Sequence, residues 1–178
     1  WFRDEFCRDL PAGAAGYAAL DALVQSVPCG CDGLAFLPFL SGSVDPDACP
    51  EARAVFFGAR LSTTRAHFAR SVMESVAFLL RDFFGMLNAL GCPADTVYSL
   101  GGGARSAVWQ QIKADACGRT FRVPACSEAT AMGAALLAGW GSGLIASGVF
   151  PCRGESAVYL PDNARAPAYD TAYSLYKK

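Results

Sequence analysis

Three consecutive glycines between a short apolar segment and a helical pattern constrain this chain more than any other feature of its sequence. Residues 97–100, which begin with the β-branched Val97 and the aromatic Tyr98, predict a short strand, and the pattern after Ser106 predicts a helix that ends at Gly118. Glycines permit backbone conformations with positive φ and carry no Cβ that would obstruct a ligand. The following helix directs its free N–H groups and the positive end of its dipole at the turn, which favours a phosphate or a nucleotide.

The spacing of these glycines excludes two common nucleotide motifs. The chain contains no GxxxxGK[ST] sequence, so the turn is not a P-loop. Contiguous glycines also differ from the spaced GxGxxG of dinucleotide-binding folds. A run of three glycines can be no more than a tight turn, so the flanking segments must carry the argument.

Those flanks resemble the nucleotide-binding segment of the FGGY carbohydrate kinases, especially the xylulokinase branch. The resemblance lies in Gly-Gly-Gly-Ala-Arg-Ser at residues 101–106, followed by Trp109, Gln111, Ala114 and Asp115. It implies a two-lobed enzyme whose α/β lobes have the actin/sugar-kinase/Hsp70 ATPase fold, which is ribonuclease H-like.

Two further segments resemble the same family in the expected order. Residues 55–58 read Val-Phe-Phe-Gly and are followed by His67-Phe68 and by Ser-Val-Met-Glu at 71–74, although Ala59 replaces a larger aliphatic residue. Residues 128–135 have the form Glu-x-Thr-Ala-x-Gly-Ala-Ala, which in the family packs beside the nucleotide loop. The loop at residues 40–46 lacks the Glu and Arg usual in the family, so it does not identify the substrate.

The order of the predicted elements indicates an α/β fold with a mainly parallel sheet covered by helices. A buried strand that ends at Pro38 is predicted in the apolar run 34–40, and another strand is predicted at 120–123. A long helix should run from Thr63 or Thr64 to about Leu90, and Ser127 should cap another. Shorter helices are predicted at 1–10, 17–27 and 169–176, with a connector at 149–168.

The resemblance implies that residues 1–178 are the C-terminal nucleotide-binding lobe of a two-lobed sugar kinase. The N-terminal lobe is then absent from this chain, as are the first strands of its own lobe. The apolar content of 53 % fits this interpretation, because part of the apolar surface would face the partner lobe.

Bulk properties exclude several other classes. The net charge of −1 gives no electrostatic basis for binding nucleic acid or an anionic membrane, and no apolar run approaches 18 residues. We expect no signal peptide, and the eight cysteines therefore predict thiols in a reducing cytoplasm. With His67 as the sole histidine, Cys29-Gly30-Cys31 is not expected to bind zinc, and we predict no metal site.

For the site, the resemblance implies that ATP contacts the backbone at the glycine turn, with Mg²⁺ as the accompanying ion. The predicted nucleotide-binding residues are Gly101, Gly102, Gly103, Ala104 and Ser106. Some relatives have an Asn that reaches the adenine where this chain has Ala107, so adenine recognition would rely on backbone and packing.

No segment matches the part of the family that bears the catalytic Asp, so we expect no catalytic residue here and no activity of this chain alone. The carboxylates of Asp45 and Asp115 are expected to be structural, and Glu74 could be a buried ion-pair partner. His67 is expected to be a surface or helix-capping residue.

The implied activity is ATP-dependent phosphorylation of a small sugar or polyol, with a ketopentose such as xylulose as the first expectation. Ribulose, fuculose, gluconate and glycerol remain open, as does a homodimer. Two alternatives also remain: an actin-like or chaperone-type ATPase of the same fold, and an isolated nucleotide-binding module.

Overall fold

The structure is a computed structural model that describes residues 1–43, 48–126, 128–146, 148 and 154–178. Its helices are α1 (Phe2–Phe6), α2 (Gly13–Gln25), α3 (Arg65–Ala89), α4 (Ala107–Cys117), α5 (Ala129–Gly141) and α6 (Ala166–Tyr176). Its strands are β1 (Ala35–Leu37), β2 (Val55–Phe57), β3 (Thr96–Tyr98), β4 (Thr120–Pro124) and β5 (Glu155–Tyr159). Single 3₁₀ turns occur at η1 (Cys31–Gly33), η2 (Gly102–Arg105) and η3 (Asn163–Arg165).

The strands form two small sheets. β3, β4 and β5 make one sheet in that order, with β3 parallel to β4 and β5 antiparallel to β4, while β1 pairs antiparallel with β2. The α/β class is confirmed, but the expectation of a mainly parallel sheet is wrong for the described strands, since one of their three pairings is parallel. We did not predict β2 or β5: residues 55–57 were considered only as part of a family motif, and residues 155–159 lie in the stretch that was predicted to be a connector.

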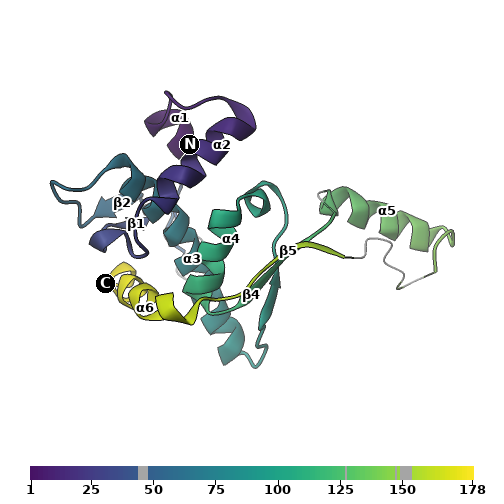
Figure 1. Ribbon diagram of the computed structural model, residues 1–178. Coiled ribbons are helices and arrows are strands. Elements are labelled where there is room, and N and C mark those ends of the chain that lie inside the picture. The colour runs from purple at the N-terminus through teal and green to yellow at the C-terminus, as the bar shows by residue number, and fades with distance from the viewer. Residues whose placement is uncertain (44–47, 127, 147, 149–153) are drawn as a thin grey trace.

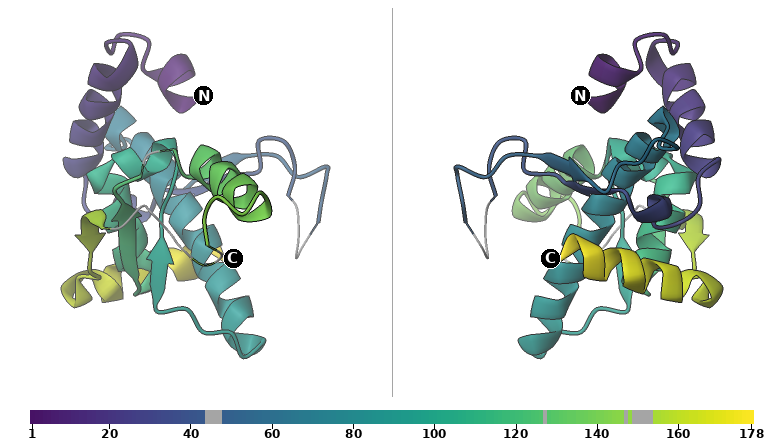
Figure 2. Two further views of the ribbon diagram at one scale, coloured as in Figure 1. Left: turned by 90° about the vertical axis from the view of Figure 1, so that its right-hand side faces the viewer. Right: turned by 90° about the vertical axis from the view of Figure 1, so that its left-hand side faces the viewer.

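Helix α3 runs through the centre of the molecule, with α2, α4 and α6 around it (Figures 1 and 2). The core between these helices and the larger sheet includes Val24, Ala77, Ile112, Phe121 and Tyr169, each of which is at most 3 % exposed. Burial of a Val, Ile or Phe side chain contributes roughly 1.5–3 kcal/mol, so this core fixes the strands that precede and follow the glycine turn.

The ends of α3 follow the sequence closely. Thr64 is the N-cap, and its N–H donates to Nδ1 of His67 at 3.1 Å, so the predicted capping role of His67 is confirmed. Nε2 of the same ring lies 3.2 Å from Asp32. The helix ends at Ala89, and Gly91 adopts a left-handed φ of 74° just beyond it.

Other helix boundaries differ from the predictions. The helix expected over residues 1–10 is only the short α1, and α2 begins at Gly13 instead of Tyr17. The predicted last helix is confirmed as α6, which begins at Ala166 with a proline in its first turn. These differences arise because apolar spacing locates the middle of a helix better than its ends.

A buried ion pair joins three helices. Nε of Arg70 donates to Oε1 of Glu74 at 2.7 Å, and the pair is almost fully buried. The other guanidinium nitrogens donate to the carbonyls of Val24 and Val27 and to the hydroxyl of Tyr169. The expectation that Glu74 has a buried partner is confirmed, and the partner is a residue that we had not singled out.

Helix α5 stands apart from the rest of the molecule, beyond the ends of β4 and β5 (Figure 1). Within it only Leu136 and Gly139 are buried, and Leu137 is 67 % exposed. The resemblance implied that this segment packs beside the glycine turn, and the described residues of α5 do not do so (Figure 1). Glu128 occupies the N-cap position, and the predicted cap Ser127 lies outside the described residues.

Seven of the eight cysteines fall in the described part of the chain, and all seven are free thiols. Cys152 lies outside it. None of the helices that the structure describes combines the length and apolar character needed to span a bilayer.

Candidate functional site

The glycine turn connects the end of β3 to the start of α4, as the sequence predicted. The N–H of Ser99 donates to the carbonyl of Arg122 at 2.8 Å, which extends the contact between the two strands beyond β3. Gly101 then turns the chain with φ of 79°, a value that residues with a Cβ rarely adopt. The next four residues form η2, and α4 begins immediately after Ser106.

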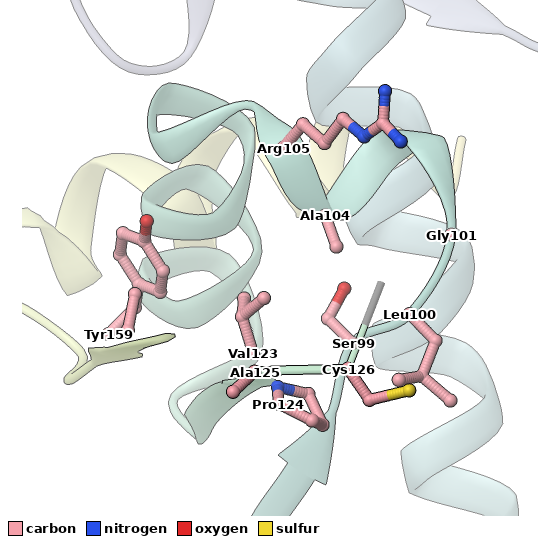
Figure 3. Close-up of a pocket in the computed structure, with 11 residues that line it drawn as sticks. Ser99, Leu100, Gly101, Ala104, Arg105, Val123, Pro124, Ala125, Cys126 and Tyr159 are labelled. Atoms are coloured by element: carbon pink, nitrogen blue, oxygen red, sulfur yellow. The ribbon is translucent and has the colours of Figure 1, made fainter. Parts of the chain in front are cut away.

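A cavity of about 260 Å³ lies at this turn. Figure 3 shows its lining residues, which come from the turn and the two residues before it, from the end of β4 and the segment after it, and from β5: Ser99, Leu100, Gly101, Ala104, Arg105, Val123, Pro124, Ala125, Cys126, Ala157 and Tyr159. It therefore opens at the carboxyl ends of the parallel strands β3 and β4, where ligands of α/β sheets bind. Its volume is below the roughly 300–1,000 Å³ of complete small-molecule pockets, so it suits the phosphate portion of a nucleotide.

Within the turn, the backbone N–H groups of Gly102 and Gly103 are among those that have no acceptor in the residues that the structure describes. The N–H of Ala104, by contrast, donates to the carbonyl of Gly101 at 3.1 Å. A Cβ placed on Gly101 or Gly102 would meet no atom within 4 Å, so a ligand could approach the backbone there. Unpaired N–H groups beside open space at the start of a helical segment form a typical anion site.

Ser106 caps α4, as predicted. Its hydroxyl accepts the N–H of Trp109 at 3.0 Å and donates to Oδ1 of Asp21 on α2 at 2.8 Å. Partial burial raises the pKa of Asp21, and the bond from Ser106 acts in the opposite direction. The hydroxyl is thus engaged in holding the helix start against α2.

Replacing Ser106 by alanine should destabilise the chain by about 1–2 kcal/mol, because the cap of α4 and the partner of Asp21 are lost together. Chemical denaturation followed by circular dichroism measures this change. Ser26→Ala is the matched control, since that hydroxyl donates only to Leu23 at the exposed end of α2. Equal stabilities of the two variants would contradict the capping role.

Arg105 is a residue of the site that we had not predicted. Its exposed side chain lines the cavity and forms no ion pair with the part of the chain that the structure describes. Figure 3 shows the guanidinium extending from the turn above Ala104. A cation beside the unpaired N–H groups adds a charge that suits phosphate. Its place inside the glycine motif was the signal available in the sequence.

The carboxylate of Asp115 has the structural role that the sequence predicted. Its side chain is 0 % exposed and pairs with Arg165 at 3.0 Å. It also accepts bonds from the backbone N–H of Asp162 and from Gln111. Asp45, the other carboxylate considered, lies outside the described residues. In the described ranges no three acidic, cysteine or histidine side chains are grouped so that they could hold a metal ion.

Residues 1–142 match the model of the FGGY family of carbohydrate kinases, C-terminal domain. The chain belongs to the FGGY family of carbohydrate kinases. The predicted family is thereby confirmed on most of the chain, and the matched FGGY domain includes the glycine turn, α4 and α5.

Individual FGGY relatives support the same conclusion. The xylulose kinase of Bacillus subtilis (strain 168) is 32 % identical over 99 % of this chain and 35 % of its own length. The gluconokinase of the same organism is 30 % identical over 99 % of this chain and 36 % of its own. The crystal structure of the Rhodospirillum rubrum xylulose kinase has a TM-score of 0.79 and 32 % identity, covering 99 % of this chain and 36 % of that one.

These comparisons confirm the predicted fold, since the neighbours are sugar kinases of the actin/Hsp70-like ATPase fold. The chain spans about a third of the length of these relatives.

Proposed function

We propose that this chain is the nucleotide-binding part of an ATP-dependent carbohydrate kinase. The observation that carries the proposal is the glycine turn, which presents N–H groups and an arginine side chain, none with a partner among the described residues, at the carboxyl ends of parallel strands. The remaining two thirds of a kinase of ordinary family length would lie elsewhere in a longer polypeptide.

Within this site each residue has a distinct role. Gly101 bends the chain, and the N–H groups of Gly102 and Gly103 bind phosphate oxygens. Ala104 lines the cavity floor, and Ser106 fixes the start of α4 through its two hydrogen bonds. Ala107 is exposed beside the turn and has no polar side-chain atom, so adenine would be recognised there by backbone and packing.

Phosphoryl transfer requires that an acceptor hydroxyl be placed in line with the γ-phosphate and that charge be balanced. Mg²⁺ neutralises charge on the phosphates when bound. The described residues beside the turn offer no carboxylate cluster to hold it. We propose that its protein ligands and the catalytic base lie in the rest of the kinase. This chain positions the phosphates through fixed backbone dipoles, which need no reorganisation during transfer.

For the acceptor we propose a small sugar or polyol, with xylulose first and gluconate next. The relatives that carry these two names match the chain with 32 % and 30 % identity, so the chain itself does not separate them. Free thiols at seven cysteines support a reducing, cytoplasmic setting.

A coupled ADP-release assay with Mg-ATP and a panel of xylulose, ribulose, gluconate and glycerol tests this proposal. It should be run on the chain alone and on the gene product extended upstream. We expect turnover only in the extended protein and with one acceptor. Turnover that ignores every acceptor would indicate an ATPase of the same fold. Turnover by the chain alone would mean that a carboxylate such as Asp45 or Asp115 is catalytic.

A further inference from the structure

The side chain of Gln110 bonds to the glycine turn from inside the molecule. Gln110 lies in the first turn of α4 and is 0 % exposed. Its Nε2 donates to the carbonyl oxygen of Gly103 at 2.8 Å. No other described side chain forms a hydrogen bond with the backbone of residues 101–105.

This bond and a backbone bond hold one peptide plane from both sides. The carbonyl of Gly103 and the N–H of Ala104 belong to the same planar trans unit and therefore point in opposite directions. Gln110 binds the carbonyl, while the N–H donates to the carbonyl of Gly101 at 3.1 Å. The peptide between Gly103 and Ala104 thus cannot rotate without breaking one of the two bonds.

The clamp matters because the residues before it are glycines. Glycine has the largest backbone freedom in an unconstrained turn, so its N–H groups would otherwise sample many directions. We propose that Gln110 is a positioning residue that fixes this peptide and thereby directs the N–H groups of Gly102 and Gly103 toward the bound phosphate. The inference rests on the proposed function of the turn.

A second observation argues against a purely structural role for Gln110. Its Oε1 atom is buried and has no hydrogen-bond partner among the described residues. A buried amide oxygen without a partner is unfavourable, so an apolar side chain of similar length would fill this space at lower cost. What the amide provides that an apolar side chain cannot is the bond to Gly103.

Gln110→Met removes the donor while keeping the length of the side chain. In the 178-residue chain, the amide proton of Ala104 should exchange about tenfold faster in this variant, because loss of one net hydrogen bond is worth about that factor. In the extended kinase, the KM for Mg-ATP should rise by about tenfold, with kcat within about twofold.

Gln111→Met is the matched control on the next residue of the same helix. Gln111 bonds to Asp115 and to the carbonyl of Leu160 and makes no bond to the turn. It should lower the melting temperature more than Gln110→Met does and leave both the Ala104 exchange rate and the KM unchanged. If Gln110 had a purely structural role, Gln110→Met would lower the melting temperature as much as Gln111→Met does, or more.

Each result has a defined meaning. Unchanged exchange at Ala104 in Gln110→Met overturns the clamp. A second variant, Gly102→Asp, would place a carboxylate at the proposed phosphate site and so should raise the KM for Mg-ATP. Unchanged KM in Gln110→Met, together with a raised KM in Gly102→Asp, overturns the positioning role alone. If Gly102→Asp also leaves the KM unchanged, the proposed function has failed instead. If Gln110→Met does not fold, the proposal can be tested on the unmodified chain. Fast exchange of the Gln110 side-chain amide protons would show that the bond to the carbonyl of Gly103 is absent, which overturns the clamp.

Discussion

Replacing Arg70 by methionine should destabilise the chain by about 3–5 kcal/mol, because the substitution leaves a buried carboxylate without its counter-charge. Glu74 is only 2 % exposed, and Arg70 is its partner at 2.7 Å. The same change removes the donors to the carbonyls of Val24 and Val27 and to the hydroxyl of Tyr169, so α2 and α6 lose their common link to α3. Urea denaturation at pH 7 measures the effect.

The loss should depend on pH in a defined direction. Burial raises the pKa of Glu74 above its ordinary value, and the charge of Arg70 opposes that rise. Without Arg70 the pKa rises further, so the folded variant binds a proton that the unfolded chain has released. Stability of Arg70→Met should therefore fall as the pH rises from about 4.3 through the raised pKa, and be highest below that range.

Arg65→Met provides the control for this experiment. Arg65 lies on the same helix and pairs with Asp9 on the surface, where both side chains are substantially exposed. Such pairs contribute about 0–1 kcal/mol, and the variant should show no comparable dependence on pH. If both variants lost the same stability, the buried network would not be the feature that holds the helices together.

The parts of the fold that the sequence predicted are those whose evidence is local. Thr64 and Gly91 mark the two ends of α3, because a capping side chain and a left-handed glycine act within one helical turn. Ser106 and Gly118 define α4 for the same reason. The parallel pairing of β3 with β4 followed from the helix between them, since such a crossover returns the chain in the same direction.

What was missed depends on contacts between residues far apart in the chain. β5 pairs with β4 across more than thirty residues, and its own sequence reads as a connector. The network around Arg70 also joins residues of α2, α3 and α6, and the local signal for it in the sequence is the spacing of four between Arg70 and Glu74.

The candidate site also combines features with a local signal in the sequence and features that depend on contacts formed only in the fold. The glycines and Ser106 could be assigned from the motif, because turn and cap chemistry is encoded in neighbouring residues. The clamp from Gln110 could not, since nothing in the order of the residues shows that this side chain, and not Gln111, points back to Gly103. The position of α5 was expected from resemblance, and the described residues provide no packing surface for its exposed Leu137.

In the extended kinase, Gly102→Asp should raise the KM for Mg-ATP by roughly 10²- to 10³-fold. A carboxylate at this position would lie beside the N–H groups of Gly102 and Gly103, which have no acceptor in the described part of the chain and where phosphate is proposed to bind. Two like charges about 4 Å apart repel by roughly 4 kcal/mol near a protein surface, which accounts for a change of this size. Initial rates at saturating sugar and varied Mg-ATP give the measurement.

Gly102 is the most informative of the three glycines, because the structure tolerates a side chain there. Its φ is not in the left-handed region, and a Cβ would meet no atom within 4 Å. Gly101 has a left-handed φ, and a Cβ on Gly103 would lie 3.1 Å from the ring of Trp109, so changes at either position would disturb the fold. Gly102→Ala is therefore the steric control and should raise the KM far less than the aspartate does. An unchanged KM in Gly102→Asp, with the fold intact, would remove the glycine turn from the nucleotide site.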